Sequence, residues 1–112
     1  MLEARTAAPV FAALGDPTRL DVVMRLGDHG PLSTASLTAG TRFSRQAITK
    51  HLTALQRAGL VRSARAGRDR IWELETRRLA ELRGYIDAIS AEWDRALERL
   101  RSLVERPELD GS

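Results

Sequence analysis

The sequence contains no cysteine among its 112 residues. Disulfide bonds, zinc sites built from thiolates and thiol redox chemistry are therefore excluded. Aromatic residues make up only 4% of the chain, which argues against the stacking platforms of proteins that bind single-stranded nucleic acid or RNA. No uninterrupted apolar run of about 18 residues is present, so we expect no membrane span.

Catalytic groupings are also lacking. We find no nucleophile paired with a base, no glycine loop suited to a phosphate and no cluster of metal ligands. The two histidines, His29 and His51, have no second ligand at metal spacing. Glu92 and Asp94 would point to different sides of a helix, so ion pairing with nearby arginines explains them better than catalysis. We therefore expect no enzyme, no cofactor and no bound metal.

The N-terminal segment mixes acidic and basic residues and lacks the layout of a signal peptide. This predicts a cytoplasmic protein, associated with the nucleoid if it binds DNA. A chain of 112 residues, 43% of them apolar, is the size of one domain with a thin core.

Positive charge is concentrated in one segment. The net charge is only +3, but residues 42–70 include eight basic residues and one acidic residue, a local net charge of +7. The remaining residues have ten basic and fourteen acidic side chains, a net charge of −4. A positive patch confined to one part of a sequence is expected of a surface that binds phosphates.

The basic segment begins with a predicted amphipathic helix, capped by Ser44 and ended by Gly59. A shorter helix precedes it across a short turn. This helix is predicted at 34–39, opened by Leu32 and Ser33, with Leu37 toward the core and Gly40 at its end. Two such helices are the helix-turn-helix pattern. The apolar side of the longer helix consists of Ala47, Ile48, Leu52, Leu55 and Ala58. Its polar side consists of Arg45, Gln46, Thr49, Lys50, Thr53, Gln56 and Arg57.

Two strands are predicted after this helix, at residues 61–65 and 70–74, with a turn at 66–69. Trp72 and Leu74 alternate toward the core. A two-stranded hairpin is only marginally stable alone, so it must pack on the helices and form a wing. The arginines at its tip are Arg65, Arg68 and Arg70.

Two helices are expected before the helix-turn-helix. The first is predicted at residues 9–14, and the second begins with Asp16 as N-cap and Pro17 as its first residue. Gly15 between them is expected to be left-handed, and the glycines and proline of 27–31 end the second helix. The positions expected to face the core are Val10, Phe11 and Leu14 in the first helix and Leu20, Val23, Met24 and Leu26 in the second.

The longest helix is expected at residues 76–106, where no proline or turn cluster interrupts the sequence. It would reach roughly 45 Å at 1.5 Å per residue, longer than a domain of this size. Part of its apolar stripe can pack on its own domain, and the surplus predicts contact with a second subunit. The stripe consists of Leu79, Leu82, Ile86, Ile89, Trp93, Leu97, Leu100 and Leu103/Val104.

These elements predict a mainly α protein with a small β-hairpin wing. It is a winged helix-turn-helix of about five helices with a long C-terminal dimerisation helix. We expect one domain over residues 1–112. Within it, residues 8–75 form the winged-helix core, 76–106 the dimerisation helix and 107–112 a polar tail.

Three segments, FAALGDPTRLDVVMRL, AITKHLTALQRAGLV and AGRDRIWEL, occur in an order and spacing that resemble the ArsR-type winged-helix transcriptional repressors. The resemblance covers about residues 8–105. It implies a homodimer, built from the first and last helices, that binds an inverted-repeat operator in double-stranded DNA and blocks transcription. The dimer contacts would be Val10, Phe11, Leu14, Leu82, Ile86, Ile89, Trp93, Leu97 and Leu100.

The resemblance also implies which residues contact DNA. Glutamine can bond adenine, lysine or arginine can bond guanine, and wing arginines usually contact phosphates. For His51, the sequence leaves a phosphate contact and a buried structural role open, and the family pattern favours proximity to DNA. In the major groove would lie Ser44, Arg45, Gln46, Thr49, Lys50 and His51. At the backbone or minor groove would lie Arg65, Arg68 and Arg70.

The sequence departs from the metal-sensing members of that family. Those members have a cysteine pair in the helix at 34–39, or histidine and carboxylate ligands on the terminal helix. Here the first region is TASLTA and the terminal helix has no histidine. The metal-sensing function is therefore not carried over. An unidentified small molecule at the dimer interface, a partner protein, or expression level alone could provide regulation.

The main alternative is a dimeric protein-interaction module that has the winged-helix shape without binding DNA. The local charge of +7 argues against it.

Overall fold

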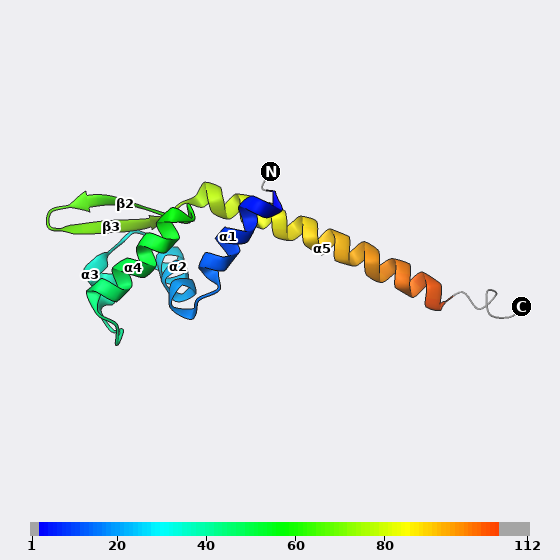
Figure 1. The fold of residues 1–112 in the computed structure, drawn as a ribbon, viewed down its shortest axis with the longest axis horizontal. Coiled ribbons are helices and arrows are strands. Elements are labelled where there is room, and N and C mark those ends of the chain that lie inside the picture. The colour runs from blue at the N-terminus through cyan, green and yellow to red at the C-terminus, as the bar shows by residue number, and fades with distance from the viewer. Residues whose placement is uncertain (1–2, 106–112) are drawn as a thin grey trace, which may run out of the picture.

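The computed structural model describes residues 3–105. In this part of the chain five helices and three strands follow in the order α1, α2, β1, α3, α4, β2, β3 and α5 (Figure 1). This confirms the predicted mainly α winged helix-turn-helix. The sheet has three antiparallel strands, however, where we expected a two-stranded hairpin. In Figure 1, α1 to α4 gather beside the hairpin and most of α5 projects away from them.

Helix α1 (Ala4–Leu14) begins earlier than the predicted residue 9. Pro9 lies inside the helix instead of opening it, although proline removes one backbone hydrogen bond there. The added turn buries Ala7, which is 1% exposed, and this burial favours the longer helix. Gly15 has a φ of −76°, so the predicted left-handed end of α1 is wrong.

Helix α2 (Pro17–His29) begins as predicted, with the Asp16 carboxylate accepting a hydrogen bond from the Arg19 N–H at 3.0 Å. This bond is the main contact that lowers the pKa of Asp16. The predicted break at 27–31 comes too early, because the helix continues to His29 and ends at Gly30, whose φ is +78°.

The core-facing side of α2 was predicted only in part. Val23 and Leu26 are buried as expected, together with Val22. Leu20 and Met24, however, are 46% and 58% exposed. Apolar residues surround more than half of this helix, so periodicity alone could not select the side that packs.

Strand β1 (Leu32–Ser33) was not predicted, since we expected these two residues to open the next helix. It pairs with β3 (Asp69–Leu74), so that Leu32 lies opposite Trp72 and Ser33 opposite Ile71. The order in the sheet is β1-β3-β2. A strand of two residues is too short to show an alternating pattern, which explains why the sequence did not indicate it.

Helices α3 (Thr34–Thr38) and α4 (Arg45–Arg57) form the predicted helix-turn-helix. The end of α4 is a left-handed glycine cap. Gly59 has a φ of +78°, its N–H bonds the Gln56 carbonyl, and the Leu60 N–H bonds the Leu55 carbonyl. These two hydrogen bonds turn the chain sharply into β2 (Val61–Ala66).

The hairpin of β2 and β3 is attached to the helices through Trp72. This side chain is 3% exposed, and its indole Nε1–H donates to the hydroxyl of the buried Thr34 at 2.9 Å. The hairpin therefore packs on the start of α3, which satisfies the polar atom of each residue. One core contains all of the buried apolar residues: Ala7, Val10, Ala13, Val22, Val23, Leu26, Leu37, Ile48, Leu52, Leu55, Leu60, Val61, Trp72 and Leu82.

Helix α5 (Thr76–Val104) is the longest element and spans 29 residues. Its first part packs on the core through Leu82 and through Tyr85, whose ring lies 5.9 Å from that of Phe11 in α1. Its remainder gives the molecule extents of 77 × 30 × 23 Å. The predicted end of the helix at 106 and the tail at 107–112 lie outside the described residues.

Replacing Gly59 by alanine is expected to lower the free energy of unfolding by roughly 1–3 kcal/mol, because a side chain at φ +78° is strained. A Cβ there would also lie 2.9 Å from Arg78 Nε. Gly84 on α5 is the matched control, because a Cβ added at this position would enter open space. Gly84→Ala should raise the free energy of unfolding by about 1 kcal/mol. Urea unfolding measures the free energy of unfolding of both variants. Equal effects would contradict the assignment of Gly59 as the left-handed cap of α4.

Candidate nucleic-acid interface

The exposed side of α4 is determined by the burial of its other side. Ile48, Leu52 and Leu55 are all 0% exposed, and this stripe fixes the rotation of the helix about its axis. The Ser44 hydroxyl oxygen accepts a hydrogen bond from the Ala47 N–H at 3.0 Å and caps the first turn. The polar residues between the stripe positions therefore face solvent.

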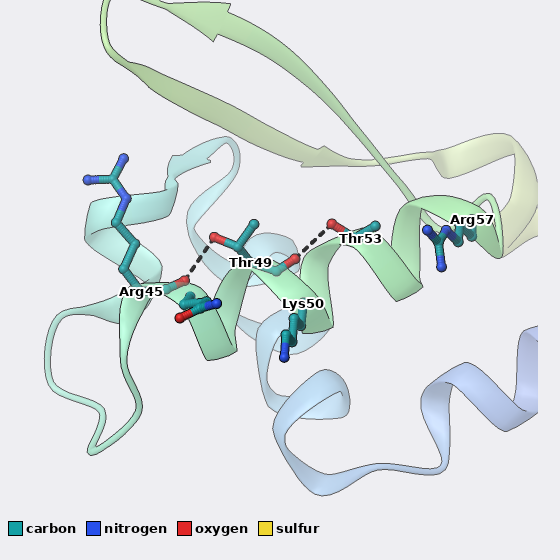
Figure 2. Close-up of a pocket in the computed structure, with 6 residues that line it drawn as sticks. Arg45, Thr49, Lys50, Thr53 and Arg57 are labelled. Carbon is teal, nitrogen blue, oxygen red and sulfur yellow. Dashed lines mark hydrogen bonds between the residues drawn. The ribbon is translucent and has the colours of Figure 1, made fainter.

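These polar residues form an open, concave surface, which we call the α4 face. In Figure 2 its side chains follow one another along the helix, from Arg45 at the N-terminal end to Arg57 at the other. Its residues are Arg45, Gln46, Thr49, Lys50, Thr53 and Arg57. Three of these side chains are cationic and none is acidic, so the α4 face attracts anions.

The two threonines of the α4 face use their hydroxyl hydrogens within the helix. Thr49 Oγ1 donates to the Arg45 carbonyl at 2.8 Å, and Thr53 Oγ1 donates to the Thr49 carbonyl at 2.9 Å (Figure 2). Each threonine can then offer a ligand only oxygen lone pairs and its methyl group. Such a methyl group suits contact with the C5-methyl group of thymine.

The three predicted wing arginines, Arg65, Arg68 and Arg70, are all exposed at the outer end of the hairpin. Arg65 and Arg70 are direct partners in the β2–β3 register. They share a side of the sheet with Trp72, because residues two apart in a strand point the same way. Like charges directly opposite each other destabilise a strand pair, so this pair would gain from a bound anion.

Asp69, the one acidic residue in 42–70, connects the hairpin to α4. Its Oδ1 lies 2.8 Å from Arg45 Nη2 and accepts from the Arg70 N–H at 2.7 Å. Its Oδ2 accepts from the Ala35 N–H at 3.1 Å. The Arg70 N–H, followed by the Ala35 N–H, the Thr34 hydroxyl and Arg45, holds the pKa of Asp69 below its usual value. The carboxylate is therefore charged at neutral pH.

Arg62 contributes less to the basic surface than its sequence position suggests. Its Nε lies 2.6 Å from Glu73 Oε1, and its Nη1 lies 3.4 Å from Glu75 Oε2. The hydrogen bond to Glu73 is the main contact that raises the pKa of Arg62. Glu73 and Glu75 lie just after residues 42–70, so the local charge of +7 does not include them. That value therefore overstates the positive charge available to a ligand.

His51 lies apart from the α4 face. Its Nδ1 is 3.8 Å from Asp16 Oδ2 and 3.5 Å from Arg19 Nη1, and its ring meets Phe43 edge-on at 6.4 Å. The side chain is 23% exposed. These contacts join α4 to the start of α2 while part of the ring stays exposed.

The structure thus brings four of the six predicted recognition-helix residues together. Ser44 caps the helix beside them, and His51 lies on its other flank. The prediction placed Thr53 and Arg57 on the polar side of the helix but did not include them among the DNA contacts, although their spacing of four from Thr49 onward could have indicated them. It also missed Asp69, and no local pattern shows that this acid contacts Arg45. The four residues brought together are Arg45, Gln46, Thr49 and Lys50.

The residues predicted to form a dimer interface fall into two groups. Val10 and Leu82 are 3% and 4% exposed and belong to the core of the chain, and Phe11 and Leu14 are partly buried against it. The others, Ile86, Ile89, Trp93, Leu97 and Leu100, are exposed. Together with the exposed Leu103 and Val104, which the prediction did not include as dimer contacts, they form an apolar row that we call the α5 stripe. An exposed apolar row of this length marks an interaction surface.

Three acidic residues of α5, Glu81, Glu92 and Glu98, take part in ion pairs with arginines. Within residues 3–105, the expected ion pairing is thus present for Glu92 but not for Asp94. Glu92 pairs with Arg95, while Arg101 contacts both Glu98 and Glu105. Between residues 3 and 105, no three histidine, aspartate or glutamate side chains gather closely enough to hold a metal ion. Nor does any helix in that range combine the length and apolar character needed to cross a bilayer.

Known proteins similar to this chain are transcriptional regulators. A family model described as a helix-turn-helix domain matches residues 14–64. The HTH-type transcriptional regulator Rv2034 of Mycobacterium tuberculosis is 37% identical over 101 residues, covering 90% of this chain and 91% of that protein. The arsenic resistance transcriptional regulator ArsR1 of Pseudomonas putida is 32% identical over 114 residues, covering 96% and 88%.

A solved structure agrees with these relatives. An ArsR-like transcriptional regulator from Rhodococcus sp. RHA1 matches with a TM-score of 0.76 and 39% identity, covering 91% of this chain and 95% of that one. The expectation of a regulator that is not an enzyme is confirmed by these matches. From its helix-turn-helix, its hairpin wing and these relatives, the chain belongs to the ArsR family of winged helix-turn-helix, DNA-binding transcriptional regulators.

Proposed function

We propose that the protein is a homodimeric repressor that binds an inverted-repeat operator in double-stranded DNA in the cytoplasm. The observation that supports this most directly is the α4 face, with its three cations, one amide and two threonines beside an arginine-tipped hairpin. An α-helix fits the major groove of B-DNA, where such side chains can contact base edges.

Helix α4 is the proposed recognition helix, with two kinds of contact. Arg45 and Lys50 can bond guanine, Gln46 can bond adenine, and the Thr49 methyl group can contact thymine. The remaining residues would contact phosphate oxygens, which fix the position of a protein on the duplex. That second group consists of Ser44, His51 and Arg57. The Thr53 hydroxyl hydrogen is used within the helix, so Thr53 can offer DNA only its oxygen lone pairs and its methyl group.

The wing arginines Arg65, Arg68 and Arg70 are proposed to contact the DNA backbone beside the recognition helix. All three are exposed, and the facing pair Arg65 and Arg70 has a like-charge repulsion that a phosphate would relieve. Backbone contacts of this kind make binding dependent on salt. If a dimer neutralises six to ten phosphates, affinity should fall by about 10³–10⁵ between 50 and 200 mM salt.

A second copy of the chain is the proposed partner of the α5 stripe. The row is apolar and spaced by three and four, as in paired helices. A winged helix-turn-helix domain from Mycobacterium bovis, solved in solution, is described as homodimeric. At 23% identity and a TM-score of 0.63, it is similar to this chain in fold. We assign residues 8–75 to the winged-helix core, 76–106 to dimerisation and 107–112 to a tail.

In the proposed mechanism, the paired α5 helices hold two α4 helices about 34 Å apart, so that they enter successive major grooves on one side of the duplex. The two-fold symmetry of the dimer requires an inverted repeat. Occupancy of such a site in a promoter excludes RNA polymerase. A small molecule or protein bound near α5 would regulate the protein by altering the distance between the two α4 helices.

Replacing Arg45 and Lys50 together by alanine is expected to abolish specific DNA binding and leave the oligomeric state unchanged. Each base contact is worth roughly 1–3 kcal/mol, so the dissociation constant should rise at least about a hundredfold. Fluorescence anisotropy with a duplex selected from a randomised library by the wild-type protein measures this change.

The matched control removes the same charge from the outer part of α5, as Arg95→Ala with Arg99→Ala. It should bind the selected duplex like the wild-type protein. Wild-type affinity in the α4 variant would contradict the assignment of α4 as the recognition helix.

Replacing Arg68 by alanine removes one cation from the turn of the wing. Because a phosphate contact is independent of sequence, affinity for the selected duplex and for a scrambled duplex should fall by the same factor. Because a homodimer loses two such contacts, the slope of log affinity against log salt concentration should decrease by about 2. A loss restricted to the selected duplex would instead assign a base contact to Arg68.

Replacing Trp93, which is 65% exposed in the α5 stripe, by aspartate should produce a monomer. A buried charge at an interface is costly, and the dimer dissociation constant should increase at least about thirtyfold. Ala91→Asp places the same charge about half a turn away and should remain dimeric. Light scattering at micromolar concentration distinguishes the two, and a monomeric wild-type protein would refute the dimer.

A further inference from the structure

Asp69 is an acid at the edge of a surface that is otherwise basic. Its charge repels DNA phosphates and so weakens binding to every duplex, whatever the sequence. It is also the one acidic residue within 42–70. A residue that opposes binding at this position needs another role, and its contacts indicate which.

The Asp69 carboxylate is fixed by the backbone of two separate elements. Oδ1 accepts from the Arg70 N–H of β3 at 2.7 Å, and Oδ2 accepts from the Ala35 N–H of α3 at 3.1 Å. The side chain is only 22% exposed. Both oxygens are therefore held in place by rigid donors, independently of the arginine that contacts them.

Arg45 is the more exposed member of the pair. It is the first residue of α4, its side chain is 56% exposed, and its Nη2 lies 2.8 Å from Asp69 Oδ1. An exposed ion pair adds little to folding stability. It can, however, select one position of a long side chain before DNA arrives, which reduces the entropy lost on binding.

The ion pair of Arg45 and Asp69 lies on the side of the α4 face that is nearer the hairpin. In Figure 2 the Arg45 side chain extends toward the hairpin, whereas Lys50 points to the opposite side of the helix. Arg45 contacts Asp69 through Nη2 and its side chain is 56% exposed, so the guanidinium has further N–H groups with which to bond a base. Asp69 therefore orders a single cation of this surface without covering it.

We propose that Asp69 is a positioning residue that fixes the Arg45 guanidinium for contact with a base in the major groove. The inference rests on the proposed function of α4 as the recognition helix. Asp69 lowers affinity for DNA in general and raises discrimination between sequences. The sequence preference of this protein thus depends on a contact between its wing and its recognition helix.

The test compares Asp69→Asn with the wild-type protein on two duplexes. One is selected from a randomised library by the wild-type protein, and the other is a scrambled duplex of the same composition. Affinity for the scrambled duplex should rise about two- to threefold, because a negative charge is removed. The ratio of the two affinities should fall about tenfold, within the range that one arginine–guanine contact contributes.

Single base-pair substitutions in the selected duplex locate the effect. Asp69→Asn should flatten discrimination at the same position in each half-site as Arg45→Ala. In the Arg45→Ala background, Asp69→Asn should change discrimination no further. Glu73→Gln is the matched control, since it removes a hairpin acid that pairs with Arg62 instead, and it should leave the affinity ratio unchanged.

Three results would overturn the inference. An unchanged affinity ratio in Asp69→Asn would show that Arg45 leaves Asp69 when DNA binds. Equal loss of discrimination at all positions, with a lowered melting temperature and the same effect in the Arg45→Ala background, would show that Asp69 only supports the fold. Failure of the wild-type protein to enrich any duplex would refute the proposed function as well.

Discussion

The fold depends on the complete burial of one side of α4. Ile48, Leu52 and Leu55 are fully enclosed, and α4 is contacted by α1, α2, α3 and β2. Each such side chain contributes roughly 1.5–3 kcal/mol, a large share of the net stability of a small domain. Because these contacts fix the helix from several directions, its other side can be wholly polar. The α4 face is thus a consequence of core packing.

The wing is held to this core more firmly than a free hairpin would be. Strand β1 pairs with β3, Trp72 is buried with its N–H bonded to Thr34, and Asp69 bonds the start of α3. These contacts all join the hairpin to the segment that precedes α4. Helix α4 and the wing therefore belong to one rigid framework, and the arginines at the hairpin tip keep a defined position relative to the α4 face.

Features that depend on neighbouring residues could be predicted from the sequence. Caps at Asp16, Ser44 and Gly59 follow from side-chain and backbone chemistry within one turn, and helical periodicity placed every residue of the α4 face on the polar side of the helix. Features that depend on distant packing could not. The exposure of Leu20, the strand β1 and the contact between Asp69 and Arg45 are each determined by which segments meet in the fold.

If the α5 stripe joins two chains as proposed, DNA occupancy becomes sensitive to cell growth. In the proposed dimer, two chains must meet before either can hold an operator half-site in register. Below the dimer dissociation constant, the amount of dimer varies with the square of the chain concentration. Each doubling in cell volume without new synthesis would then reduce the dimer concentration about fourfold. Because only the dimer holds the operator, dilution of the chain would lead the protein to dissociate from the promoter. This response would depend on the row of exposed apolar side chains on α5.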